Sequence, residues 1–157
     1  STFVTPFIYG GAQEKGLRAG TEAVHQIVGM SKAIDICFEN LDSYQKHITQ
    51  LKSYCLEKLQ TNFQGIKING INTFYNIINV LLPFSEEKTA MILFNLDIKG
   101  IAVSRGSACQ SGSIKPSHVL AEILNPLDLK KPSLRISFSH ENTTADIDAL
   151  VEVLRSI

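Results

Sequence analysis

Hydrophobic residues recur at helical spacing in the first third of the chain and again at its end. Over residues 24–38, and again over 41–59, apolar side chains step by three or four positions, which predicts two successive helices. Thr21 is placed to cap the first of these helices. Near the end, Thr143 and Asp146 form a variant capping box. The helix that they open is predicted to bury Ile147, Leu150, Val151 and Leu154.

The middle of the chain changes to the pattern of strands. Ile66 and Ile68 alternate with polar neighbours and residues 76–82 are rich in β-branched side chains, which predicts two strands joined by a turn near Gly70 and Asn72. Four further elements are predicted: a helix over 85–96, a strand over 101–104, a helix over 115–124 and a strand over 134–139. This order predicts an α+β fold with a small, partly antiparallel sheet covered by helices.

The composition indicates which classes of binding partner are not expected. The 157 residues fit one domain, and the 15 Lys and Arg residues equal the 15 Asp and Glu residues. That balance gives no reason to expect nucleic acid or an anionic membrane as a partner, and the longest apolar run, 77–84, is too short to span a bilayer. No signal peptide is visible. Because a glycine-rich motif follows Ser1 within ten residues, we expect the chain to be a piece of a longer one.

The three cysteines fall into two kinds. Their odd number and wide spacing predict neither a disulfide framework nor a zinc site, so we expect a reducing cytoplasm. Cys37 and Cys55 lie among apolar residues at helical spacing and are predicted to be small buried hydrophobes. Cys109 lies in residues 104–113, where no hydrophobic side chain exceeds alanine, so we expect it on an exposed, mobile loop. With Arg105 nearby it is either a reactive thiolate or an incidental surface thiol.

Two other motifs are weak when taken singly. The glycine-rich segment 10–21 could let backbone approach a bound anion, with Thr21 offering a hydroxyl, or it could be an ordinary loop before a helix. Arg135, on the polar face of a predicted strand, could hold a carboxylate through two parallel hydrogen bonds, or it could be a solvated surface residue.

Taken together and in order, the motifs carry a resemblance. The strings are Gly10-Gly11-x-Gln13-Glu14-x-Gly16-x-Arg18-x-Gly20-Thr21, Ser104-x-Gly106-Ser107-Ala108-Cys109-x-Ser111 and Leu134-Arg135-Ile136-Ser137-Phe138. They resemble the cysteine desulfurases of iron–sulfur cluster assembly that have a long cysteine loop, which belong to the class V aminotransferases among fold-type I pyridoxal-phosphate enzymes. The resemblance implies that residues 1–21 are a loop from the large domain and dimer interface. Residues 22–157 would be the C-terminal small domain, with the catalytic-cysteine loop at 104–116.

The resemblance also implies an activity and its residues. In the intact enzyme Cys109 would take sulfur from L-cysteine as a persulfide, leaving L-alanine, for iron–sulfur cluster or thio-cofactor biosynthesis. Arg135 would bind the substrate carboxylate, and Thr21 would reach the phosphate of pyridoxal 5'-phosphate in the partner subunit of a homodimer. The partner protein would be a sulfur acceptor or an iron–sulfur scaffold. The family's Schiff-base lysine follows a histidine in a Ser-x-His-Lys string, which this chain lacks, so the chain alone is expected to be inactive.

Several alternatives stay open on the sequence. A selenocysteine lyase or a class V aminotransferase without desulfurase activity would share the fold, and a non-catalytic thiol or interaction module would keep it without the chemistry. The chain also departs from the family pattern, where a third glycine, an arginine and a serine are common, by having Ala12, Lys15 and Ala19. These departures leave the proposed catalytic roles intact.

Overall fold

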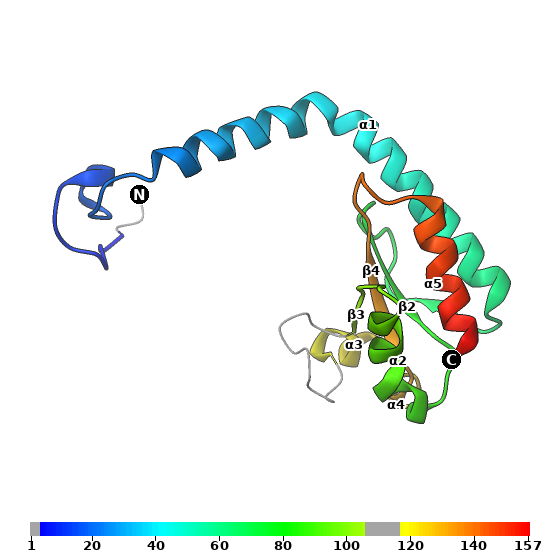
Figure 1. The fold of residues 1–157 in the computed structure, drawn as a ribbon. Helices are drawn as coiled ribbons and strands as arrows, with labels where there is room; N and C mark the ends of the chain where they lie inside the picture. Colours follow the sequence, from blue (N-terminus) through cyan, green and yellow to red (C-terminus); the bar gives the residue numbers. More distant parts are fainter. Residues whose placement is uncertain (1–3, 106–116) are drawn as a thin grey trace. The chain divides into compact units, whose positions relative to one another are not determined.

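The computed structural model of the chain describes residues 4–105 and 117–157. They form two compact units, residues 1–41 and 42–157, each of which is described by itself. The predicted functional division into 1–21 and 22–157 stays a prediction. The helices are η1 Gln13–Gly16, α1 Val24–Asn62, α2 Glu86–Ile98, α3 His118–Ile123, α4 Pro126–Lys130 and α5 Thr144–Ser156 (Figure 1).

Helix α1 corrects the prediction of two helices at the start of the chain. The structure has one continuous helix from Val24 to Asn62. Between Gly29 and Asn62 the sequence contains neither glycine nor proline, so nothing in residues 38–41 ends the helix. The two apolar stripes therefore belong to successive parts of one helix.

Four short strands form the sheet. They are β1 Lys67–Ile68, β2 Ile77–Leu81, β3 Ser104–Arg105 and β4 Ser133–Ser137. Their order across the sheet is β1-β2-β4-β3, and each of the three pairings is antiparallel. The prediction of a small α+β domain is confirmed, with strand ends shifted by a few residues.

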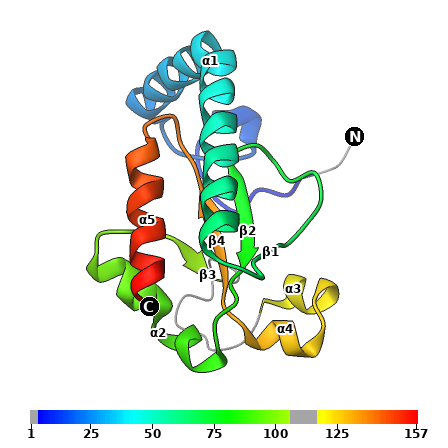
Figure 2. The same ribbon diagram turned by 90° about the vertical axis from the view of Figure 1, so that its right-hand side faces the viewer.

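The hydrophobic core lies against one face of this sheet. Ile78, Val80, Leu134 and Ile136 point to that face and are at most 5% exposed. Helix α5 and the later part of α1 lie side by side over it, and α2 contributes Ile92 and Leu96 (Figure 2). Burying a leucine or isoleucine contributes about 1.5–3 kcal/mol, so each of these side chains stabilises the packing of the helices on this face.

Helix α5 begins as the sequence predicts. The backbone N–H of Thr143 donates to Oδ2 of Asp146 at 2.9 Å, as expected for a capping box. All four residues of the predicted apolar face are buried. On its outer side, Asp148 accepts a hydrogen bond from the Tyr54 hydroxyl at 2.9 Å and pairs with Lys58 at 3.1 Å, which joins α5 to α1.

Sequence reasoning missed α4. Asn125 caps this helix by accepting from the backbone N–H groups of Leu127 and Asp128, and Pro126 occupies its first turn. The preceding helix α3 begins at His118 rather than near residue 115, while residues 115 and 116 lie outside the described part of the chain. Within the described residues, no helix is long and apolar enough to cross a membrane.

Candidate active site

The second face of the sheet carries the candidate site. Arg135 lies in the middle of β4, with Asn79 of β2 as its direct partner on one side and Ser104 of β3 on the other. Residues directly opposite each other in an antiparallel pair project to the same face, with Cβ atoms roughly 4.5–5.5 Å apart. The alternation that buries Leu134 and Ile136 in the core therefore brings three polar side chains together on the opposite face.

Within the described part of the chain, the guanidinium of Arg135 has fewer hydrogen-bond partners than it has donors. Its Nη2 donates to the hydroxyl oxygen of Ser104 at 3.2 Å. Its Nε is buried and donates to no acceptor among the described residues. Because an unsatisfied buried donor costs about 1–3 kcal/mol or more when the group is charged, this arrangement favours an external acceptor. A carboxylate is the acceptor whose two oxygens match a guanidinium.

Asn79 belongs to a small hydrogen-bond network that begins on the β1 side. Asn69 donates from Nδ2 to Oδ1 of Asn79 at 2.7 Å and to the Ser133 hydroxyl at 3.3 Å. The backbone N–H of Asn69 also donates to the carbonyl oxygen of Asn79 at 2.8 Å. Since Asn69 and Ser133 are buried, these bonds fix the side chain of Asn79 next to Arg135. Neither asparagine was predicted from the sequence to belong to the site.

Cys109 lies outside the described residues, so its predicted exposure and loop stay predictions. It lies five positions beyond Ser104 in the sequence, and a chain of that length spans at most about 18 Å. Arg105, which was predicted to favour the thiolate, is the register partner of Leu134 and so lies on the sheet face opposite to that of Arg135. Burial lowers the pKa of its guanidinium.

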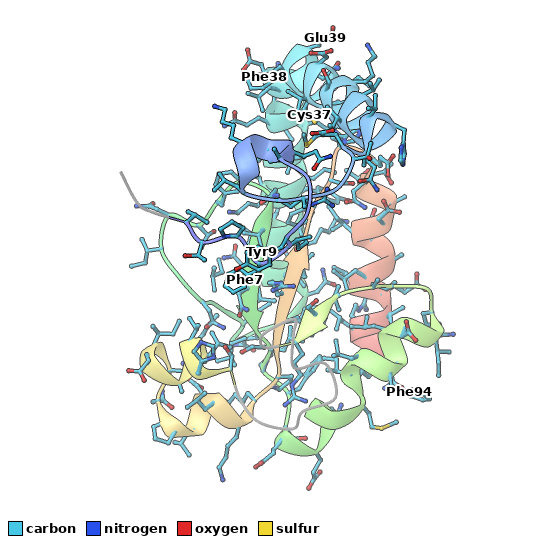
Figure 3. The ribbon with its side chains drawn as sticks, turned by 90° about the vertical axis from the view of Figure 1, so that its left-hand side faces the viewer. Phe7, Tyr9, Cys37, Phe38, Glu39 and Phe94 are labelled. Atoms are coloured by element: carbon cyan, nitrogen blue, oxygen red, sulfur yellow. The ribbon has the colours of Figure 1, made fainter. Side chains whose placement is uncertain are left out.

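The other two cysteines differ from each other. Cys55 is buried in the core, as predicted, and burial raises the pKa of its thiol to about 12. The same prediction was wrong for Cys37, which is exposed on α1 beside Phe38 and Glu39 (Figure 3). Apolar spacing failed there because the neighbouring apolar residues of α1 are themselves exposed in the described residues, with Phe38 at 74%.

The glycine-rich segment is held together by two of its own motif residues. Gln13 accepts, through Oε1, a hydrogen bond from the backbone N–H of Gly20 at 3.2 Å, and Arg18 donates from Nη1 to the carbonyl oxygen of Gly20 at 3.3 Å. Gly20 has φ = +110°, which favours glycine. Both long side chains thus fix the residue just before Thr21, a structural role that the sequence analysis did not assign.

Thr21 is exposed three residues before the first residue of α1. Among the described residues its hydroxyl has no hydrogen-bond partner. Thr21 therefore does not cap this helix, which corrects the sequence prediction, and its contact with a cofactor phosphate stays a prediction. Thr21 belongs to the first unit and Arg135 to the second. Over residues 4–105 and 117–157, no group of three or more His, Cys, Asp or Glu side chains is arranged to hold a metal.

Comparison with known proteins gives consistent matches. The family model of class-V aminotransferases matches residues 7–150. The "Cysteine desulfurase IscS" of Dictyoglomus turgidum is 37% identical over 158 residues, which is 99% of this chain and 40% of that relative. The "Cysteine desulfurase, mitosomal" of Encephalitozoon cuniculi is 35% identical over 146 residues, 92% of this chain and 33% of that relative.

A solved structure matches over the same extent. The crystal structure of a NifS-like protein from Rickettsia africae superposes with a TM-score of 0.78 and 30% identity, over 99% of this chain and 40% of that protein. The chain therefore spans about 33–40% of the length of these relatives.

Proposed function

Since the chain belongs to the class-V aminotransferase family, we propose that it forms the small domain of a cysteine desulfurase and supplies the sulfur-accepting thiol, Cys109. The observation that carries the proposal is Arg135. Its guanidinium has a buried, unused Nε and is hydrogen-bonded to Ser104, from which the chain runs directly to Cys109. The strand that carries Arg135 thus pairs with the strand from which the chain continues towards the proposed sulfur-accepting thiol.

The proposed substrate is L-cysteine, bound through its carboxylate by Arg135. A guanidinium on an inner strand of the sheet holds the substrate's orientation better than one on a flexible loop, because its backbone is fixed on both sides by Asn79 and Ser104. In this orientation the substrate's sulfur would be presented to Cys109. The reach of about 18 Å from Ser104 to Cys109 is compatible with that encounter.

The sulfur transfer is a nucleophilic step carried by Cys109. Its thiolate attacks the sulfur of the substrate, so that a sulfur–sulfur bond forms and the carbon–sulfur bond breaks. The electron pair of the broken bond stays with the substrate, whose β-carbon takes up a proton and becomes the methyl group of L-alanine. When bound, pyridoxal phosphate would supply the electron sink that makes this bond breakable.

Residues of the glycine-rich segment would position the cofactor. Thr21 would donate its hydroxyl to the phosphate, held in place by the Gln13 and Arg18 bonds to Gly20. In the proposed homodimer this phosphate belongs to the partner subunit. The Schiff-base lysine would come from a part of the enzyme that this chain does not contain, because no Ser-x-His-Lys string occurs in it. The persulfide on Cys109 would pass to a sulfur-acceptor or iron–sulfur scaffold protein in the cytoplasm.

Product analysis on the full-length polypeptide that contains this chain tests the proposal. With L-cysteine and a reducing agent, the wild-type protein should form alanine and sulfide in equal amounts. Arg135→Gln should raise the KM for L-cysteine by at least about 10-fold, since a hydrogen bond to a charged group contributes about 1.5–3 kcal/mol. Alanine formed from L-selenocysteine alone would identify a selenocysteine lyase and overturn the proposal, as would an unchanged KM in the variant.

A further inference from the structure

The site contains a second donor that the proposed function does not use. Asn79 is the direct cross-strand partner of Arg135, on the same polar face of the sheet. Its carbonyl oxygen Oδ1 is already occupied by the 2.7 Å hydrogen bond from Asn69. Its amide nitrogen Nδ2, which carries two N–H groups, donates to no acceptor within residues 4–105 and 117–157.

The Asn69 bond determines which end of the Asn79 amide is available. Asn69 is bonded to β2 from the β1 side, through both its backbone N–H and its side chain. Arg135 lies on the other side of β2, in β4. With Oδ1 held by Asn69, Nδ2 is the part of the amide that can serve a ligand of the neighbouring guanidinium.

The hydrogen-bonding groups and charges around Arg135 and Asn79 determine which chemical class of ligand can bind there. The unused Nε of Arg135 and the Nδ2 of Asn79 are both donors, and no acidic residue occurs in β2, β3 or β4. The neighbouring polar residues on this face, Ser104 and Ser133, are already in hydrogen bonds with Arg135 and Asn69. A ligand placed between the two donors must therefore bring acceptors and a negative charge.

We propose that Asn79 is a further carboxylate-binding residue, whose Nδ2 donates to the same carboxylate that Arg135 holds. The carboxylate subsite then spans β2 and β4, and Asn69 is a positioning residue that orients the amide of Asn79. The inference rests on the proposed function only in that the carboxylate is that of an amino-acid substrate. It predicts selectivity for α-amino acids over amines that lack the carboxylate.

The test compares two ligands that differ only in the carboxylate, L-alanine and ethylamine. Their dissociation constants are measured on the full-length polypeptide with pyridoxal phosphate bound, from the cofactor's absorbance and without turnover. Asn79→Asp keeps an oxygen acceptor for Asn69 but replaces the donor with a negative charge. It should weaken L-alanine binding by at least about 10-fold while changing ethylamine binding less than about twofold.

Two further variants make the result specific. Asn79→Ser removes the amide donor without adding charge and should weaken L-alanine binding by about threefold to 10-fold; it decides the matter if the aspartate variant does not fold. Ser137→Asp is the matched control, because Ser137 is exposed on the same face of β4, two residues beyond Arg135. It should weaken L-alanine binding by less than about threefold.

Three outcomes would overturn the proposal. The first is unchanged L-alanine binding in the Asn79 variants. The second is an equal loss of affinity for L-alanine and ethylamine, which would make Asn79 purely structural. The third is a loss of L-alanine affinity in Ser137→Asp as large as that in Asn79→Asp. Failure of the proposed function gives a different result. The wild-type protein would then bind L-alanine through its carboxylate but form no alanine from L-cysteine.

Discussion

Ser104 accepts a hydrogen bond from Nη2 of Arg135 at 3.2 Å, and this bond connects the two parts of the proposed chemistry. Arg135 lies on β4, which is paired on both sides, whereas Ser104 lies on the short strand β3. Five residues beyond Ser104 the chain reaches Cys109. The residue that accepts from the proposed carboxylate-binding guanidinium is therefore also the one from which the chain continues to the thiol.

Removing the Ser104 hydroxyl should weaken substrate binding. In the full-length polypeptide, Ser104→Ala leaves Nη2 of Arg135 without its protein acceptor and the guanidinium less well oriented. The KM for L-cysteine should rise by about threefold to 10-fold with little change in kcat, because a neutral hydrogen bond contributes about 0.5–1.5 kcal/mol and the carboxylate is bound before and during the reaction. Steady-state kinetics measures KM and kcat.

Ser137→Ala is the control and should leave the KM for L-cysteine within twofold of the wild-type value. A lowered kcat at unchanged KM for Ser104→Ala would contradict the role of Ser104 in substrate binding.

The glycine-rich loop should respond to a single methyl group. Gly20 has φ = +110°, and a β-carbon on it would lie 3.2 Å from Nη1 of Arg18. Gly20→Ala should therefore strain the loop by about 1–3 kcal/mol and speed hydrogen exchange at the backbone N–H of residue 20, which donates to Gln13.

Gly29→Ala provides the matched comparison, because Gly29 lies within α1 and nothing stands within 4 Å of the added carbon. It should leave the exchange of the loop unchanged. Equal exchange at residue 20 in the wild-type protein and the Gly20→Ala variant would show that the loop does not depend on these two bonds.

The thiols should react with an alkylating reagent in a defined order. Cys55 should resist labelling until the protein unfolds, because burial raises the pKa of its thiol to about 12 and excludes the reagent. Cys37 is exposed and should react in the folded state. Cys109 should react before both if it is the sulfur acceptor. Peptide mapping by mass spectrometry at limiting reagent gives the order, and early labelling of Cys55 in native protein would contradict the buried core.

The stability of the β1–α4 region should depend on pH through Asp128. Its carboxylate, with the side chain 7% exposed, pairs with Lys67 and Lys131 at 2.7 Å each. Hydrogen bonds from Lys131 and Lys67 lower its pKa from 3.8 to about 2. A pKa that is lower in the folded state gives stability that is present above pH 4 and is lost as the pH falls towards 2.

Asp128→Asn provides the measurement. Urea unfolding should show the wild-type protein more stable than the variant at pH 5–6, with the difference shrinking as the pH approaches 2. Lys130→Gln is a control of similar location, because Lys130 is exposed and pairs with the exposed Glu86 at 3.8 Å. A wild-type advantage that stays constant from pH 6 to pH 2 would exclude Asp128 as the titrating group.

Local sequence patterns predicted most of the fold, because each pattern depends on residues that are close together in the sequence. The capping box at Thr143 and the alternation around Arg135 depend on residues a few positions apart, and both are confirmed. The helix break predicted before Leu41 was wrong. The end of the first apolar stripe was interpreted as the end of a helix, although no helix-breaking residue occurs there. The exposure of Cys37 depends on what covers α1, which spacing along a helix does not specify.

The site was predictable only in part for a similar reason. Arg135 could be assigned to a polar strand face from alternation alone. That Asn79 is its partner depends on the register of β2 against β4, residues 56 positions apart in the chain, and the register is set by the packing of both strands against the helices. The contacts of Gln13 and Arg18 with Gly20 likewise require the turn of the loop.

The location of the transferred sulfur decides whether Cys109 is the sulfur acceptor. The full-length polypeptide with pyridoxal phosphate bound is incubated with sulfur-labelled L-cysteine, trapped by alkylation without reductant and mapped by mass spectrometry. The account predicts one labelled persulfide, on the peptide that contains Cys109, in step with alanine formation, and its loss in Cys109→Ser. Alanine formed at the normal rate with the label on Cys37 or on no protein thiol, or undiminished sulfur transfer by the Cys109→Ser variant, would contradict it.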